Sequence, residues 1–310
     1  MTSHAPDTQN SNAAYRGRLA PSPTGLLHIG HARTFWIAYQ RVVTHHGTLV
    51  LRNEDLDQPR CKREFVEAMI RDLQWLGVQW QEGPDVGGPF SPYSQSQRQP
   101  LYEAAFHQLR AAGAVYPCTC SRQDVLRALQ APHARDDEPI YPGTCRPRPT
   151  NVSFETPESK IQNPSQSKIQ NPKSKITNWR FRVPDGEPIR FVDGRFGPQE
   201  FVAGRDFGDF VVWRHDGSPS YQLAVVVDDT AMRITEIVRG ADLLRSTARQ
   251  LLLYQALGWA PPSFFHCPLM TDSAGVRLAK RHDALSLAKL RSQGVLPEQL
   301  RAASSTGTQS

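Results

Sequence analysis

Apolar residues in the first third of the chain alternate between strand-like runs and helical spacings. The run 15–20 predicts a short strand, which the prolines and glycine of 21–25 end. Apolar residues at helical spacing predict a helix from residue 30 to about 46, and a buried strand is predicted over 48–52. Two further amphipathic helices, each closed by a glycine, are predicted over about 62–76 and 98–112. This alternation favours an α/β fold with a largely parallel sheet.

The second half of the chain predicts three strands and one helix. Strands are expected at 179–183 and 210–213, and the continuous apolar run Ala224–Val227 is typical of a central strand. A turn at Asp216 and Gly217 follows the second of these strands. An apolar-faced helix is expected over 247–257, ended by the glycine after it.

A low-complexity stretch separates the two halves. The sequence SKIQNP begins at Ser159 and again at Ser167, among lysines and prolines and with little apolar surface. We expect 151–177 to be a flexible insertion, because it cannot bury enough apolar surface to order itself. A basic tether for RNA is the alternative.

The composition restricts the classes of protein to which the chain can belong. With 310 residues, the chain is long enough for one large domain with an insertion, or for two domains. It has neither an apolar run long enough to span a membrane nor a signal peptide, and its five cysteines are an odd number that suits a reducing cytoplasm. The net charge of +6 fits a polyanionic partner without requiring one. We therefore expect a cytoplasmic protein with no membrane partner.

Candidate chemistry first appears at His28 and His31, which open the predicted helix after the proline-rich loop. The N-terminus of a helix attracts anions, and two imidazoles there can hydrogen-bond a triphosphate. Gly30 would let a nucleotide approach the backbone closely. For the tetrapeptide alone, a helix cap or a metal pair is the simpler explanation.

A cluster of cysteines marks a second candidate site. Cys118, Cys120 and Cys145 offer three thiolates, and the phenol of Tyr141 offers an oxygen. Together they can complete a tetrahedral zinc shell. By spacing alone, unpaired structural cysteines are an equally good explanation.

The segment Arg18–His31, RLAPSPTGLLHIGH, resembles the first signature of the class I aminoacyl-tRNA synthetases, in the form used by the glutamyl and glutaminyl branch. The resemblance continues at 52–57, 221–229 and 236–243 and spans most of 15–290. It implies a Rossmann-type α/β catalytic domain.

The second signature of this class is a lysine-bearing loop, and 277–281 takes its place. By resemblance, Lys280 is the catalytic lysine and would neutralise charge on the phosphates as pyrophosphate leaves. Ala279 departs from the serine that is frequent in the family, and we expect this to tune the rate. The resemblance implies that ATP, carried with Mg²⁺, contacts His28, Gly30, His31 and Lys280, the two histidines and the lysine being catalytic.

A glutamate site can be argued from charge, because free glutamate presents two carboxylates and one ammonium group. Arg18 and Arg239 can each bind a carboxylate as a bidentate fork, and we assign the side-chain carboxylate to Arg18. Glu54 can accept from the ammonium group, and Tyr221 adds a phenolic hydroxyl. A structural ion pair is the alternative for the charged residues. The resemblance places the glutamate site at Arg18, Leu19, Ala20, Pro21, Ser22, Glu54, Tyr221 and Arg239.

The cysteine cluster is similar to the zinc site of shortened glutamyl synthetase paralogues, which implies one structural Zn²⁺ per chain at Cys118, Cys120, Tyr141 and Cys145. Only 29 residues follow Arg281, too few for the anticodon-binding domain of a tRNA-charging enzyme. This resemblance implies a ligase that activates L-glutamate with ATP and transfers it to queuosine at the wobble position of tRNA(Asp). The alternatives are a truncated synthetase that charges the 3′ end of tRNA and a non-catalytic RNA-binding paralogue.

The resemblance divides the chain into three parts. Residues 15–115 are expected to form the first half of the nucleotide-binding catalytic domain, and 206–303 its second half with the lysine loop. Residues 116–205 are expected to form an inserted zinc-binding subdomain that contacts the acceptor and includes the flexible segment. We expect a monomer.

Overall fold

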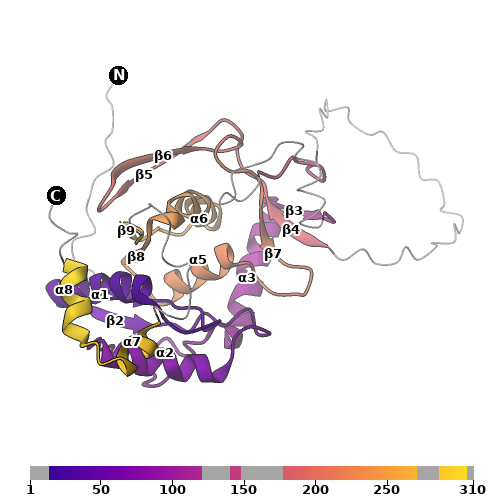
Figure 1. Cartoon of the computed structure of the whole chain (residues 1–310). Coiled ribbons are helices and arrows are strands. Elements are labelled where there is room, and N and C mark those ends of the chain that lie inside the picture. Colours follow the sequence, from indigo (N-terminus) through magenta and orange to yellow (C-terminus); the bar gives the residue numbers. More distant parts are fainter. Residues whose placement is uncertain (1–13, 121–139, 148–176, 271–285, 306–310) are drawn as a thin grey trace, which may run out of the picture.

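Figure 1 shows the computed structural model of the chain, which describes residues 14–120, 140–147, 177–270 and 286–305. The predicted insertion, apart from its last residue, and the loop with Lys280 lie outside these ranges. Within the described residues, no helix is long and apolar enough to cross a membrane.

The first half of the chain follows the predicted alternation of strands and helices. Its elements are β1 (Arg16–Leu19), α1 (Ile29–Thr44), β2 (Thr48–Leu51), α2 (Arg63–Trp75), the short 3-10 helix η1 (Gln95–Gln97), α3 (Gln99–Ala111) and β3 (Val115–Cys118). The predicted elements in this half are confirmed to within two residues at each end. Gly77 and Gly113 follow α2 and α3 with φ angles of 82° and 66°, which glycine adopts without strain, and this explains why these helices end there.

The second half contains more strands than the sequence predicted. Its elements are β4 (Asn178–Phe181), β5 (Pro188–Asp193), β6 (Gly197–Val202), β7 (Phe210–Trp213), α5 (Tyr221–Ala231), β8 (Glu236–Gly240), η2 (Ala241–Leu243), α6 (Leu244–Leu257), β9 (Ser263–Cys267), α7 (Leu287–Ser292) and α8 (Pro297–Ser305). The strands predicted at 179–183 and 210–213 are confirmed as β4 and β7, and the helix predicted over 247–257 is confirmed as α6.

The predicted central strand Ala224–Val227 is wrong, because these residues lie within α5. The side chain of Ser220 caps this helix by accepting a hydrogen bond from the Leu223 amide. Residues 223–229 are all buried, so the helix has no solvent-exposed face over this stretch. A short apolar run cannot distinguish a fully buried helix from a buried strand.

Parallel strands form the centre of the molecule. β1 pairs in parallel with β2, β8 with β9, and β9 with β5, while β6 is antiparallel to β5. The amide of Thr235 donates to the carbonyl of Arg16 at 2.9 Å and so brings the start of β8 beside β1. The two halves of the chain meet at this contact, with α1 packed against both β1 and β8.

A second, antiparallel sheet in the order β3, β4, β7 lies at the opposite end of the molecule from α1 and α8 (Figure 1). The prediction of a largely parallel sheet therefore holds for the central strands and not for this sheet. β5 joins the central strands through β9, whereas β7 joins β4. The strands between residues 178 and 213 are thus divided between the two sheets: β4 and β7 belong to the antiparallel sheet, and β5 and β6 belong with the central strands.

Candidate active site

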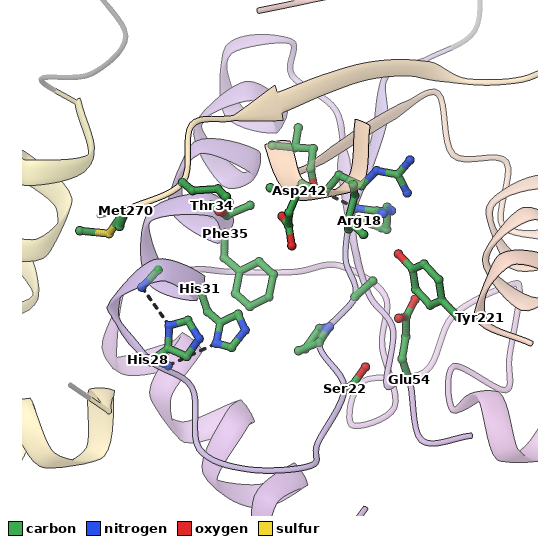
Figure 2. Close-up of a pocket in the computed structure, with 18 of the residues that line it drawn as sticks. Arg18, Ser22, His28, His31, Thr34, Phe35, Glu54, Tyr221, Asp242 and Met270 are labelled. Atoms are coloured by element: carbon green, nitrogen blue, oxygen red, sulfur yellow. Dashed lines mark hydrogen bonds between the residues drawn. The ribbon is translucent and has the colours of Figure 1, made fainter. Parts of the chain in front are cut away.

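A cavity of about 450 Å³ lies at the carboxyl ends of β1, β2, β8 and β9 (Figure 2). This is the edge at which parallel α/β sheets bind ligands, because the loops that follow the strands converge there. Ten of the predicted site residues line it: Arg18, Ala20, Pro21, Ser22, His28, Gly30, His31, Glu54, Tyr221 and Arg239.

Two predicted site residues are not among the lining residues. Leu19 is fully buried in the apolar core, because neighbouring residues of a strand face opposite sides and Arg18 takes the cavity side. Lys280 lies outside the described residues.

The sequence reasoning missed several lining residues, among them Thr34, Phe35, Asp242 and Met270. The signal for Thr34 and Phe35 was present, since they follow His31 by three and four positions and so lie on the same face of α1. Asp242 belongs to η2 after β8, and Met270 to the segment after β9. These two segments are neighbours only because β8 and β9 pair.

The two histidines at the start of α1 cap the helix and also line the cavity. His28 Nδ1 accepts from the amide of Gly30 at 3.1 Å, and His31 Nδ1 accepts from the amide of His28 at 3.3 Å (Figure 2). Their rings stack with centroids 3.7 Å apart. Because each Nδ1 accepts a backbone N–H, each neutral ring carries its proton on Nε2, where it can donate to an anionic oxygen. Both histidines can therefore cap the helix through Nδ1 and donate to a phosphate from Nε2.

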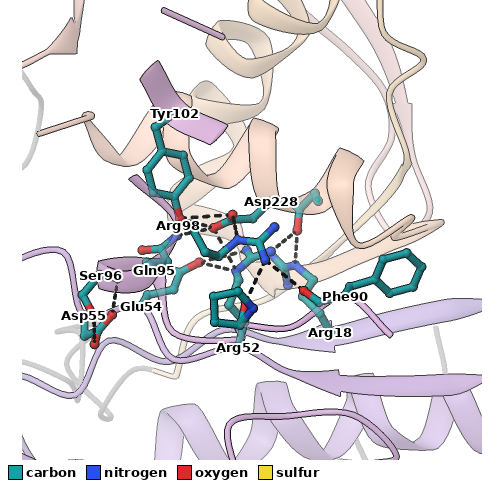
Figure 3. A network of polar contacts seen from close by, with 12 residues as sticks. Arg18, Arg52, Glu54, Asp55, Phe90, Gln95, Ser96, Arg98, Tyr102 and Asp228 are labelled. Carbon is teal, nitrogen blue, oxygen red and sulfur yellow. Dashed lines mark hydrogen bonds and ion pairs between the residues drawn. The ribbon is translucent and has the colours of Figure 1, made fainter. Parts of the chain in front are cut away.

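A buried charge network supports the floor of the cavity (Figure 3). Arg52, which is 0% exposed, donates to Glu54 Oε1 at 2.9 Å and to Asp229 Oδ1 at 2.6 Å. Arg18 Nε lies 3.4 Å from the same oxygen of Asp229. Burial raises the pKa of Glu54 above its usual range, although the positive charges of Arg52 and Arg18 act to lower it. The ion pair considered as the alternative for Glu54 is thus present, and Glu54 still lines the cavity.

The neighbouring carboxylate of Asp228 lies 3.8 Å from Arg52 Nε and is hydrogen-bonded by other residues. It accepts from Arg98 Nε at 2.6 Å and from Gln95 Nε2 at 2.8 Å, and the Tyr102 hydroxyl lies 3.0 Å from it (Figure 3). These contacts join α5 to η1 and α3 and fix the helix whose first residue is Tyr221.

Arg239 is surrounded differently from Arg18. Its side chain donates from Nε to His266 Nε2 at 3.2 Å and from Nη2 to Thr247 Oγ1 at 2.7 Å. Its Nη1 has no hydrogen-bond partner among the described residues. Arg239 is 5% exposed, and an unpaired buried donor at a cavity wall is suited to an incoming carboxylate.

The cysteine cluster forms a second site between β3 and the segment 140–147. The Sγ atoms of Cys118, Cys120 and Cys145 all lie within 4.8 Å of one another. The hydroxyl of Tyr141 lies 3.4 Å from Cys118 Sγ and 3.6 Å from Cys120 Sγ. In a tetrahedral zinc shell with Zn–S near 2.3 Å, ligand atoms are about 3.5–3.8 Å apart. The cluster can therefore hold a metal ion without large movement.

The surroundings of the cluster act in different directions on its ligands: they favour the thiolate of Cys145, whereas burial raises the pKa of Cys120 to about 11. Arg180 Nε lies 3.3 Å from Cys118 Sγ, and its guanidinium carbon stacks 3.9 Å from the centre of the Tyr141 ring. Burial opposes ionisation of Cys145, but hydrogen bonds from the Thr119 backbone and the Tyr141 hydroxyl outweigh it and lower its pKa to about 6. A thiolate is the form of cysteine that binds metal ions.

Residues 14–305 match the family model described as the catalytic domain of class I tRNA synthetases for glutamate and glutamine. The chain belongs to this family. Its resemblance to the class I signatures is thereby confirmed, as is the mixed α/β fold that the resemblance implied.

The relatives of this class I synthetase chain include shortened members of the family. A protein of Symbiobacterium thermophilum named Glutamyl-Q tRNA(Asp) synthetase is 47% identical over 91% of this chain and 83% of its own length. Its namesake from Nitratidesulfovibrio vulgaris is 46% identical over 90% of this chain and 82% of its own length. The crystal structure of a glutamate–tRNA synthetase from Elizabethkingia anophelis superposes with a TM-score of 0.71 at 28% identity, covering 87% of this chain. The chain spans about half of that structure, 53% of its length.

Proposed function

We propose that this chain is a ligase that activates L-glutamate with ATP and transfers the glutamyl group to queuosine at the wobble position of tRNA(Asp). The observation that carries the proposal is the cavity in which Arg18, Glu54 and Arg239 face the histidines at the start of α1. The two relatives named Glutamyl-Q tRNA(Asp) synthetase support the choice of acceptor.

In this proposal, glutamate binds where the buried charges meet the cavity. Arg239 and Arg18 each bind one carboxylate, the side-chain carboxylate being assigned to Arg18, and Glu54 accepts from the ammonium group. Tyr221 closes this end of the cavity with its hydroxyl. Ala20, Pro21 and Ser22 form the rim next to Arg18.

The first step joins glutamate to the nucleotide. An oxygen of the α-carboxylate attacks the α-phosphorus of ATP, the bond to the bridging oxygen breaks, and pyrophosphate leaves with the electron pair. His28 and His31 donate from Nε2 to phosphate oxygens, Gly30 allows close approach, and Lys280 neutralises the departing charge. ATP brings Mg²⁺, which shields its phosphates. Most of the acceleration comes from positioning and charge neutralisation.

In the second step, a hydroxyl oxygen of the queuosine cyclopentenediol attacks the acyl carbon of glutamyl-adenylate. A carbon–oxygen ester bond forms, the bond to AMP breaks, and the phosphate of AMP takes the hydroxyl proton. Among the described lining residues, Glu54 is paired with Arg52 and both histidines cap α1, so we assign this task to none of these three.

We assign one structural Zn²⁺ to Cys118, Cys120, Tyr141 and Cys145. Bound there, the metal would tie β3 to 140–147 and supply no chemistry to the reaction. The subdomain expected over 116–205 would contact the tRNA in this proposal. The monomer would act in the cytoplasm, where tRNA and reduced thiols are present.

The test is glutamate-dependent exchange of labelled pyrophosphate into ATP, followed by transfer to purified tRNA(Asp) with either queuosine or guanosine at the wobble position. Exchange with glutamate and transfer only to the queuosine-bearing tRNA are expected. Equal transfer to both tRNAs would favour a synthetase that charges the 3′ end. No exchange with any amino acid would favour a non-catalytic paralogue.

A further inference from the structure

We infer that Asp193 and His266 are positioning residues for substrate binding: a neutral imidazole orients Arg239 and leaves the positive charge of that arginine for a substrate carboxylate. The inference rests on the proposed function, because it takes the carboxylate to be that of glutamate.

Asp193 fixes the ring of His266. The Asp193 Oδ2 atom lies 2.6 Å from His266 Nδ1, and both side chains are fully buried. The other oxygen, Oδ1, accepts from the amides of Arg195 and Phe196 in the turn after β5. Burial is the largest effect on His266 and, with the nearby charge of Arg239, lowers its pKa to about 4 against the opposing effect of Asp193. The ring is therefore neutral near pH 7, and an ionised carboxylate can only accept, so the proton of the ring is on Nδ1.

With its proton on Nδ1, the imidazole of His266 presents Nε2 as an acceptor. That atom lies 3.2 Å from Arg239 Nε and 3.2 Å from Thr247 Oγ1. Thr247 Oγ1 in turn lies 2.7 Å from Arg239 Nη2. Two neutral groups thus hold one edge of the guanidinium. Nη1, for which the described residues provide no hydrogen-bond partner, belongs to its other side.

The strand register brings these residues together. Arg239 of β8 is directly opposite His266 of β9, and Asp193 at the end of β5 pairs with Phe264 of the same strand. The three side chains therefore come from three adjacent strands of the central sheet.

The groups that hold Arg239 are neutral, and this distinguishes it from Arg18, the other arginine of the cavity, which has an acidic neighbour. Arg18 lies 3.4 Å from Asp229, which offsets part of its charge. No described carboxylate is within ion-pair distance of Arg239. An acid in the place of His266 would orient the guanidinium equally well but would compete with the substrate for its charge. The imidazole supplies orientation alone.

The substitution Asp193→Asn tests this inference. The amide nitrogen would donate to His266 Nδ1 and drive the proton of the ring to Nε2, where it would face the N–H of Arg239. Loss of a hydrogen bond to a charged group predicts a glutamate KM raised about ten- to a hundredfold in pyrophosphate exchange. The ATP KM and the rate at saturating glutamate should change less than about threefold, because the phosphates bind elsewhere in the cavity.

Asp72→Asn is the matched control. Asp72 is also a fully buried carboxylate, paired with Arg291 at 2.8 Å between α2 and α7, and it is not among the residues that line the cavity. It should leave the glutamate KM unchanged. If Asp193→Asn does not fold, Thr247→Val tests the inference instead, because it removes the hydroxyl that accepts from Arg239 Nη2, and it should raise the glutamate KM. Thr247→Ser should restore the KM.

Nitrogen-15 NMR of the His266 ring gives a readout that is independent of activity. The wild type should show the Nδ1–H form and folded Asp193→Asn the Nε2–H form. A folded variant with the switched tautomer and an unchanged glutamate KM would overturn the inference, as would an unchanged KM in Thr247→Val. A wild-type protein that shows the Nδ1–H form but no exchange with glutamate would contradict the proposed function instead.

Discussion

Replacing Arg52 by methionine removes the cation at the centre of the buried network. Asp228 keeps its contact with Arg98, and Asp229 keeps Arg18 at 3.4 Å, so Glu54 is the carboxylate left without a hydrogen-bonded cation. Breaking a buried ion pair from one side costs about 3–5 kcal/mol. At about 2–4 °C per kcal/mol for a chain of this size class, Arg52→Met should lower the Tm by about 6–20 °C.

Circular dichroism melts measure this loss, with Arg190→Met as the control. Arg190 pairs with Glu200 at 2.8 Å, but their side chains are 67% and 48% exposed, so the control should lose less than about 1 kcal/mol. The loss in Arg52→Met should also shrink as the pH falls. Burial already raises the pKa of Glu54, and without Arg52 it rises further. Acid therefore neutralises the unpaired carboxylate: the penalty shrinks as the pH falls through the folded pKa and is gone below the ordinary value of 4.5. A Tm drop no larger than that of the control would refute the role given to the network.

Three further predictions concern other parts of the chain. Lys280→Ala should lower glutamate-dependent pyrophosphate exchange by orders of magnitude, because a charge contact to the leaving phosphates is lost; near-normal exchange would remove Lys280 from the catalytic set. Cys145→Ser should reduce the zinc content measured by atomic absorption to well below one per chain and lower the Tm, since one thiolate of the shell is lost; unchanged zinc content would exclude Cys145 as a ligand. Deletion of 155–177 should leave exchange within a few-fold, because the segment has little apolar surface to bury; a collapse of exchange would show that it is not a passive insertion.

The sequence predicted those elements whose signals are local. β1, α1, β2, α2 and α3 carry their own periodicity, and α2 and α3 end at glycines, so no distant contact is needed to recognise them. Ala224–Val227 shows where this reasoning fails. Its uniform burial between α3 and α6 erases the helical pattern, and only the capping residue Ser220 marked the start of a helix.

The candidate site divides in the same way. His28 and Arg239 belong to segments whose residue order resembles known signatures, and both line the cavity. Leu19 belongs to the same signature but faces the core, since a signature does not say which side of a strand a residue takes. Asp193 and His266 could not be predicted as site residues from the sequence. They are 73 residues apart in the chain and come together only when β5, β9 and β8 pair.

The acceptor of the glutamyl group is the most direct test of the account. Labelled glutamate, ATP and Mg²⁺ are incubated with the protein and total tRNA that contains queuosine, and the labelled nucleoside is then mapped by nuclease digestion. Our account predicts label on the wobble queuosine of tRNA(Asp). Label on the 3′-terminal adenosine, or no label on any tRNA, would contradict it.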